Sequence, residues 1–269
     1  MSIANKPIAF IGGGHITEII IENLAHSKTV SPERLMVSDP DAGRRDLLSR
    51  SFSVQTTPDN GEAVLHGDYV FINVRPQVVP KVVDDLIQSS IGVGKVIVTL
   101  AAGTPMTTYR VLGEQQPIVR ALPNPPSQVG LGMAAIAFNS HVSDAQQKDI
   151  LTLFEALGEV AILGEEYINA ATALSSPAIT YLFAQSMVDA GVRMGLDRAT
   201  ATKITHQTIV GSMEVWKKRR VPPNELMNEA CTPGGISVEC VFTLDKLGFR
   251  AAISEAIKKG ATRAKQLGG

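Results

Sequence analysis

Three consecutive glycines, Gly12-Gly13-Gly14, separate an apolar run from a helical pattern, and they constrain the fold more than any other feature of the chain. The run before them, residues 7–11, is too short for a helix and is typical of a buried strand. After them, apolar residues recur at helical spacing from His15 to His26. The sequence therefore predicts a strand, a tight glycine turn and a helix near the N-terminus.

Strands and helical stretches continue to alternate through the first half of the chain. Further strands are expected at 34–38, 69–74, 96–100 and 117–120, with additional candidates at 134–138 and 160–163. Such alternation is typical of a doubly wound parallel sheet. We therefore predict an α/β Rossmann-type dinucleotide-binding domain over residues 1–163.

The second half has a different texture, because its apolar residues recur at helical spacing and its segments are longer. One helical pattern covers 168–194 with a break near Ser175-Ser176-Pro177, and another covers 199–217. We predict an all-α domain over residues 164–269. Apolar and small residues dominate 170–194, so this helix needs burial on several sides, either by a partner subunit or by its own neighbours.

The glycine turn carries the first chemical motif. Residues 12–17 match GxGxxG/A at its first two required glycines and place Thr17 at the third. Glycines allow the backbone to approach a pyrophosphate, and the helix N-terminus favours its negative charge. Asp39 ends the second predicted strand, where a carboxylate accepts hydrogen bonds from ribose hydroxyls and repels a 2′-phosphate. Arg44 and Arg45 follow and either neutralise such a phosphate or are exposed helix charges, which leaves NADH and NADPH both open.

Composition and charge argue against several classes of protein: nucleic-acid-binding, zinc-binding, membrane and secreted proteins. The net charge is −1 and the pI is about 6.5, so neither a nucleic acid nor an anionic membrane is an expected partner. Cys231 and Cys240 lack a zinc-binding spacing, and we expect reduced thiols and no metal. No apolar run is long enough to span a bilayer, and the N-terminus lacks the pattern of a secretion signal. We therefore expect a cytoplasmic protein.

Several motifs, in order along nearly the whole chain, resemble those of the pyrroline-5-carboxylate reductase family. Residues 10–16 resemble its N-terminal glycine element, with His15 where the family commonly has Asn or Gln. Residues 74–77 resemble its VKPQ, 101–103 its AAG and 122–126 its MPNTP, while 57–60 resemble the stretch whose Asn contacts the cofactor. Near the C-terminus, residues 232–237 resemble SPGGTT and 247–250 resemble GGFR.

The resemblance implies a reductase that uses NADPH or NADH to reduce the C=N bond of a cyclic imino acid, namely 1-pyrroline-5-carboxylate to L-proline. It also implies a homodimer, or a larger homo-oligomer built on dimers. The motifs and their neighbouring strand ends give these candidate cofactor-binding residues: Ile11, Gly12, Gly13, Gly14, His15, Ile16, Ser38, Asp39, Asn60, Asn73, Val74, Arg75, Pro76, Ala101 and Ala102. The candidate substrate-binding residues are Glu166, Thr232, Gly234, Gly235, Ile236 and Ser237.

Ser237 is the candidate catalytic residue, because the resemblance places its hydroxyl at the ring nitrogen. A Pro-Gly-Gly turn that feeds a helix presents free N–H groups, which suit a small carboxylate. The alternative is an ordinary helix start in which Ser237 caps the helix. A protonated cyclic imine already carries its proton at neutral pH, so the protein mainly needs to orient the two reactants.

Two departures from the family leave the substrate open. The family's SGSGPAY loop is replaced by residues 173–179, Ala-Leu-Ser-Ser-Pro-Ala-Ile, and Ile236 and Glu239 lie beside the expected substrate turn. One alternative is a reductase of the same architecture that acts on another cyclic imine. Another is a dinucleotide-binding sensor without catalysis. Residues 179–193 contain no Lys, which argues against the related hydroxyacid dehydrogenases and an alcohol substrate.

Overall fold

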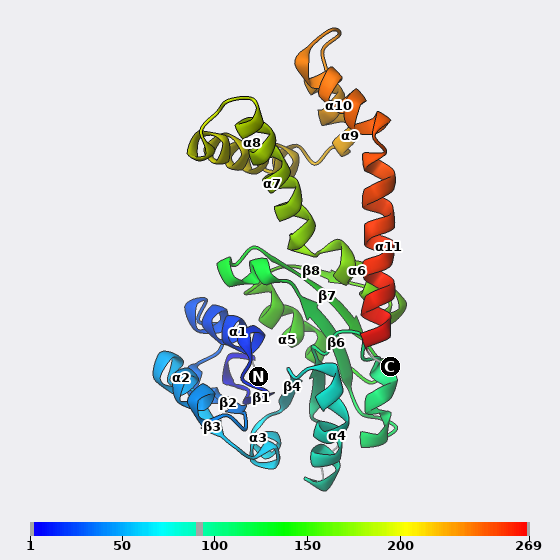
Figure 1. Ribbon diagram of the computed structural model, residues 1–269. Coiled ribbons are helices and arrows are strands. Elements are labelled where there is room, and N and C mark those ends of the chain that lie inside the picture. Colours follow the sequence, from blue (N-terminus) through cyan, green and yellow to red (C-terminus); the bar gives the residue numbers. More distant parts are fainter. Residues whose placement is uncertain (1–2, 90–93, 268–269) are drawn as a thin grey trace. The chain divides into compact units, whose positions relative to one another are not determined.

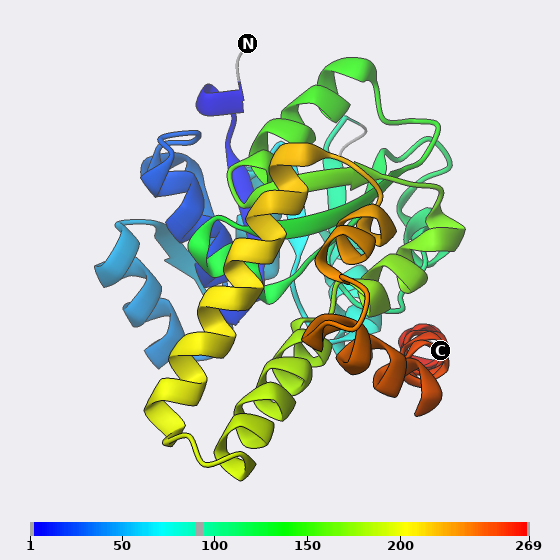
Figure 2. The ribbon, with the colours of Figure 1, turned by 90° about the horizontal axis from the view of Figure 1, so that it is seen from above.

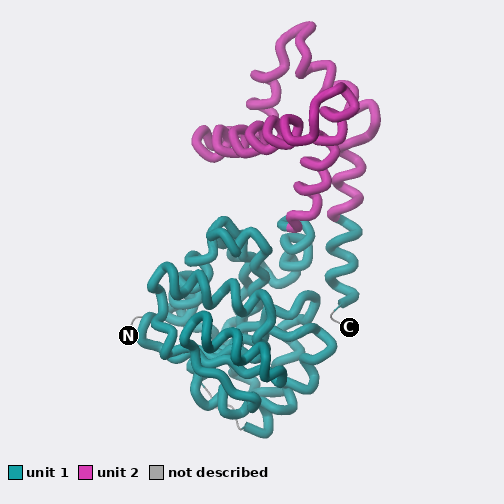
Figure 3. Tube along the Cα trace, turned by 60° about the vertical axis from the view of Figure 1, so that its left-hand side comes forward, with its two compact units in different colours: residues 1–175, 258–269 teal, residues 176–257 magenta. Residues whose placement is uncertain are grey.

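The computed structural model describes residues 3–89 and 94–267. The chain divides into two compact units, one comprising residues 1–175 and 258–269 and the other residues 176–257 (Figure 3). The domain boundary predicted after residue 163 stays a prediction.

The first unit is built on one eight-stranded sheet (Figure 1). Its strand order is β3-β2-β1-β4-β5-β6-β7-β8, which places the reversal of strand order beside β1 and β4. The strands are β1 (Ile8–Ile11), β2 (Leu35–Ser38), β3 (Gln55–Thr57), β4 (Tyr69–Ile72), β5 (Val96–Thr99), β6 (Ile118–Pro123), β7 (Gly132–Phe138) and β8 (Gly158–Ile162).

The Rossmann-type sheet predicted from the sequence is confirmed, but the sheet is mixed rather than fully parallel. Strands β1 to β6 are parallel, whereas β7 runs antiparallel to β6 and pairs Ile136 with Ala121. The connection between β6 and β7 holds only the 3-10 segment η5 (Pro125–Val129). A parallel return needs a crossover of a dozen or more residues, so this short connection reverses the chain.

Helices cover both faces of the sheet, as can be followed by colour in Figures 1 and 2. Buried side chains place α1 (His15–His26), α2 (Ala42–Phe52) and α5 (Asp144–Glu155) on one face. The other face packs against α3 (Asn60–His66), α4 (Val79–Gln88) and the start of α6 (Ile168–Leu174). The remaining 3-10 segments are η1 (Ile3–Asn5), η2 (Pro32–Arg34), η3 (Pro76–Val78), η4 (Met106–Leu112) and η6 (Glu165–Tyr167).

Alternating side chains of the central strands build the two layers of the core. Phe10 and Phe71 point to the first face, where their rings lie 5.0 Å apart, and Phe154 of α5 lies 6.1 Å from Phe71. Ile11 and Ile72 point to the opposite face. Each strand is buried on both sides, which explains why the strands read as continuous apolar runs.

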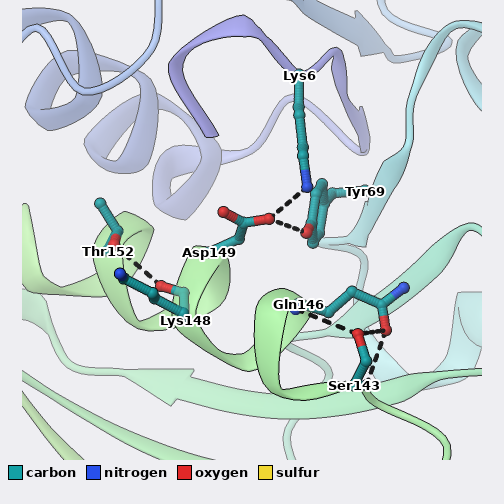
Figure 4. A network of polar contacts seen from close by, with 7 residues as sticks. All are labelled: Lys6, Tyr69, Ser143, Gln146, Lys148, Asp149 and Thr152. Carbon is teal, nitrogen blue, oxygen red and sulfur yellow. Dashed lines mark hydrogen bonds and ion pairs between the residues drawn. The ribbon is translucent and has the colours of Figure 1, made fainter. Parts of the chain in front are cut away.

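Side chains cap the N-termini of most helices in this unit that begin directly after a loop. Asp41 accepts the Arg44 amide at the start of α2, and Asp59 accepts the Gly61 amide at the start of α3. Ser143 and Gln146 form a capping box at α5 (Figure 4). Helix α1 differs, because its N-cap is Gly14 and no side chain bonds to its first amides.

The second unit is helical, as predicted. It contains α7 (Pro177–Arg193), α8 (Arg198–Arg219), α9 (Pro223–Ala230), α10 (Ile236–Lys246) and the first part of α11 (Phe249–Leu267). The break expected near Ser175-Ser176-Pro177 is confirmed, since α6 ends at Leu174 and α7 begins at Pro177. In the described part of the chain, no helix has the length and hydropathy of a membrane span.

The second unit leaves many large apolar side chains on its surface. Within it, α7 packs against α8, and the Phe183 and Phe249 rings lie 6.3 Å apart. The unit has few buried apolar residues, Val188 and Ala201 among them. Its exposed apolar side chains are Tyr181, Leu182, Phe183, Met194, Leu196, Ile204, Val210, Met213, Val215, Trp216, Ile236, Phe242, Leu244, Leu247 and Phe249.

Candidate functional site

A cavity of about 1030 Å³ opens at the carboxyl ends of β1, β2 and β4. This is the edge where an open parallel sheet binds ligands, beside its reversal of strand order. Nine of the residues predicted to bind a cofactor line this cavity: Ile11, Gly12, Gly14, Ser38, Asp39, Asn60, Asn73, Val74 and Arg75. The sequence did not identify the other polar residues of its wall, which include Asp59, Glu62, Lys81, Asp85, Gln88 and Ser89.

Gly12 needs to be glycine for two reasons. Its φ of +99° lies in the region that L side chains avoid, and a Cβ there would lie 2.7 Å from the Asn73 carbonyl oxygen. The turn is further fixed by Thr17, whose buried hydroxyl donates to the Gly12 carbonyl at 2.5 Å. That hydroxyl also accepts from Asn73 Nδ2 at 2.9 Å. Thr17 therefore occupies the position of the motif's third glycine, and its hydroxyl holds the turn by hydrogen bonds.

The arrangement at Gly14 and Asn73 fits a dinucleotide. The Gly12-Gly13-Gly14 turn and the start of α1 form a concave surface, here called the glycine cradle. A Cβ built on Gly14 meets nothing within 4 Å, so this cradle is open above the uncapped N-terminus of α1. Such a helix start offers amide donors and a positive dipole end to a pyrophosphate. Asn73 Oδ1 is a buried acceptor that no described residue satisfies, in a side chain beside the same cavity. A bound ligand with a donor group can satisfy it.

Asp39 closes the β2 end of the cavity and is fixed by two backbone donors. Its Oδ2 accepts the Gly13 amide at 2.8 Å, and its Oδ1 accepts the Asp41 amide at 2.9 Å. Arg44 Nε donates to the Gly13 carbonyl, and Arg44 Nη2 pairs with Glu18 at 2.5 Å. Arg45 donates to the carbonyls of Asp39 at 2.6 Å and of Pro40 at 3.0 Å.

A series of side-chain hydrogen bonds runs along the cavity wall from the end of β2 to α4. Ser38 Oγ donates to Asn60 Oδ1 at 2.6 Å, and Asn60 Nδ2 donates to Asp85 Oδ2 at 2.7 Å. Asn60 is therefore held in one orientation at the start of α3. Asp85 lies on α4 with no motif around it, so no pattern in the sequence pointed to it.

The remaining cofactor candidates are not among the residues that line this cavity. Gly13 is buried under the turn, His15 is exposed in the first turn of α1, and Ile16 packs half-buried against the core. Pro76 begins η3 after the β4 strand. In the turn after β5, Ala101 is buried in the core and Ala102 is half-buried.

A buried arginine, Arg120, links β6 to η6 and to α6. Arg120 is only 2% exposed, its Nη2 donates to Asn169 at 2.7 Å, and its Nη1 lies 3.6 Å from Glu165 Oε1. Burial lowers the pKa of Arg120, and the charge of Glu165 opposes that effect. The same Glu165 oxygen accepts the Met106 amide at 2.6 Å. Glu166, the candidate substrate contact, is exposed beside it.

The candidate substrate turn lies in the second unit. Gly234 adopts a φ of +69°, and the Gly235 amide donates to the Thr232 carbonyl at 2.9 Å. Helix α10 begins at Ile236 with Gly235 as its N-cap and has no side-chain cap, so Ser237 does not cap it. Ile236 is 86% exposed and Ser237 is also exposed, on the first turn of the helix. In the part of the chain that the structure describes, no cluster of side chains can hold a metal ion.

Comparison with known proteins agrees with both units. The family model described as pyrroline-5-carboxylate reductase dimerisation matches residues 165–267, and the model described as NADP oxidoreductase coenzyme F420-dependent matches residues 7–103. The chain is 34% identical to the pyrroline-5-carboxylate reductase of Synechocystis, over 97% of this chain and 98% of that protein. It is 32% identical to the Escherichia coli enzyme, over 97% of this chain and 98% of that protein.

Solved structures give the same result. The pyrroline-5-carboxylate reductase of Coxiella burnetii matches with a TM-score of 0.91 at 27% identity, covering 98% of this chain and 99% of that one. The Plasmodium falciparum pyrroline carboxylate reductase with NADP bound matches with a TM-score of 0.88 at 26% identity, covering 99% of both chains. Together with the glycine cradle and the helical second unit, these full-length matches show that the chain belongs to the pyrroline-5-carboxylate reductase family.

Proposed function

We propose that this protein reduces the C=N bond of 1-pyrroline-5-carboxylate to give L-proline, with NADH or NADPH as the hydride donor. The observation that carries the proposal is the full-length similarity to curated reductases, at 34% identity over 97% of the chain. The glycine cradle at the sheet edge supports it independently, because its shape and open amides suit a dinucleotide.

We assign the dinucleotide to the cavity of the first unit. The Gly12-Gly13-Gly14 turn and the start of α1 would hold the pyrophosphate, Asp39 and Ser38 the adenosine ribose side, and Asn60, Asn73, Val74 and Arg75 the wall. His15, Ile16, Pro76, Ala101 and Ala102 complete the assignment, because they belong to the segments that resemble the family's cofactor-binding motifs. The nicotinamide ring supplies hydride when the cofactor is bound.

We assign the substrate carboxylate to the Thr232–Gly235 turn. Its support is the uncapped start of α10, whose amides bond to no side chain. We assign Ser237 to the ring nitrogen, where its hydroxyl would orient the imine, and Ile236 and Glu166 to the remaining contacts. The imine brings its own proton at neutral pH, so the protein residues act mainly by orientation.

A different cyclic imine is the second candidate substrate. The connection between α6 and α7 consists of only Ser175 and Ser176, where the family's loop has glycines and an aromatic residue. Turnover of the six-membered homologue in preference to pyrroline-5-carboxylate would favour this candidate. Dinucleotide binding without turnover of any cyclic imine would favour the non-catalytic sensor.

We further propose that the protein is a homodimer, or a larger oligomer built on dimers, in the cytoplasm. The match to the dimerisation region and the exposed apolar side chains of the second unit support the oligomer. Cell fractionation tests the location.

A further inference from the structure

The dinucleotide cavity has an uneven distribution of charge. Its wall holds four carboxylates. Asp39 follows β2, Asp59 and Glu62 belong to the N-cap and first turn of α3, and Asp85 lies on α4. Its two cationic residues are Arg75, which follows β4, and Lys81, which lies on α4 in the same helix as Asp85. Because β1 separates β2 from β4 in the sheet, Arg75 and Asp39 enter the cavity from different strands.

Asp39 occupies the end of β2, the position from which a Rossmann fold contacts the adenosine ribose. Each of its oxygens already accepts one backbone amide, from Gly13 and from Asp41. These two bonds fix the direction of the carboxylate. A carboxylate oxygen has two acceptor sites, so each one still has capacity for a ribose hydroxyl.

The nearby arginines are committed to other partners. Arg44 bonds to the Gly13 carbonyl and pairs with Glu18, and Arg45 bonds to the carbonyls of Asp39 and Pro40. A 2′-phosphate would bring two negative charges beside Asp39, and an arginine would have to leave these partners to neutralise them. Two ribose hydroxyls require no such rearrangement.

We infer that Asp39 makes this protein select NADH over NADPH, by accepting hydrogen bonds from the ribose hydroxyls and repelling a 2′-phosphate. The inference rests on the dinucleotide assignment made above and specifies which dinucleotide the cavity takes. It does not depend on which imine is reduced. It assigns Asp39 as the residue that determines the specificity.

Equilibrium binding tests the inference without requiring turnover. NADH and NADPH are titrated separately into the full chain, and binding is followed by nicotinamide fluorescence and by calorimetry. We expect NADH to bind at least about tenfold more tightly than NADPH. In Asp39→Asn, which keeps an oxygen acceptor but loses the charge, the ratio should fall at least about threefold, and Asp39→Ser should shift it in the same direction.

Asp41→Asn is the matched control. It removes the same charge two residues away, at the cap of α2 and outside the cavity wall. Its NADH to NADPH ratio should equal that of the wild type. Equal or tighter binding of NADPH by the wild type would overturn the inference, and so would a preference that survives in both Asp39 variants. Binding of neither dinucleotide would overturn the cavity assignment as well, whereas intact binding without imine turnover would count only against the proposed substrate.

Discussion

The Tyr69 hydroxyl donates to Asp149 Oδ2 at 2.6 Å and so joins β4 to α5 within the first unit (Figure 4). Lys6 Nζ lies 2.6 Å from the same oxygen, so one carboxylate links three segments that are distant in sequence. Tyr69 is buried, and burial followed by the hydrogen bond to Asp149 raises its pKa well above the usual range.

We expect Tyr69→Phe to lower the free energy of unfolding by about 1–2 kcal/mol, because it removes a part-buried, charge-assisted hydrogen bond. Chemical denaturation at neutral pH measures the loss. Tyr167→Phe removes a hydroxyl from an exposed tyrosine and should change stability by no more than about 0.5 kcal/mol. Equal effects of the two substitutions would show that the Tyr69–Asp149 bond contributes nothing.

The raised pKa of Tyr69 also predicts loss of stability in alkali. Tyrosine in the unfolded chain ionises near pH 10, whereas folded Tyr69 keeps its proton to higher pH. The stabilisation is therefore fully present below about pH 10 and decreases as the pH rises above it. The difference in unfolding free energy between wild type and Tyr69→Phe should shrink as the pH rises from about 10 to about 12. A constant difference over that range would contradict the assignment.

Glu165→Gln tests the ion pair of Arg120. The variant keeps an oxygen that can accept the Met106 amide but leaves a buried guanidinium without its opposite charge. We expect a loss of about 1–3 kcal/mol in unfolding free energy. Glu166→Gln makes the same change one residue later at an exposed site and should stay within about 0.5 kcal/mol of wild type. If the two variants are equally stable, the Arg120 pair is not a structural link.

Gly14→Asp should abolish dinucleotide binding without unfolding the chain. A Cβ on Gly14 meets no atom within 4 Å and the residue has a φ of −65°, so the fold tolerates a side chain there. The added carboxylate would repel the pyrophosphate at the start of α1. Gly14→Asn has the same shape without the charge and should lose less affinity. Titration with NADH measures the affinity of both variants. Unchanged affinity in Gly14→Asp would refute the assignment of the pyrophosphate to the glycine cradle.

Oligomer formation can be tested on α7. Leu182 is 69% exposed in the single chain, so Leu182→Glu should fold but weaken association through the apolar surface of the second unit. Light scattering should give at least twice the 28.7 kDa chain mass for the wild type and a smaller mass for the variant. Val111→Glu changes a similarly exposed residue of η4 in the first unit and should leave the mass unchanged. A monomeric wild type at micromolar concentration would refute the homodimer.

The sequence predicted the central strands well because parallel strands that are buried on both faces appear as short apolar runs. It missed β3, whose residues Gln55, Thr56 and Thr57 are polar and pair only with β2 at the edge of the sheet. It also took β7 as parallel, because an apolar run has no direction. The short connection before Gly132 was the available signal, since it holds no helix that could return the chain.

The glycine cradle could be predicted because its residues are contiguous and its motif has a physical reason. Thr17 shows the limit, since the motif marks it only as a departure, whereas the structure shows its hydroxyl bonded to Gly12 and Asn73. Asp85 and Arg120 were not selected, because their partners lie 25 and 45 or more residues away in sequence. Side-chain pairs between residues so far apart in sequence can be identified only when the arrangement of the strands and helices is known.

The most direct test of the account is oxidation of NADH and NADPH by the full chain in the presence of 1-pyrroline-5-carboxylate, with proline identified as the product. The six-membered imino acid and plain cyclic imines serve as comparison substrates, and Ser237→Ala as the variant. The account predicts that pyrroline-5-carboxylate is consumed in preference to the others, with one proline formed for each dinucleotide oxidised, and that Ser237→Ala slows the reaction. Absence of turnover of pyrroline-5-carboxylate with either dinucleotide, in a protein that binds one of them, would contradict it.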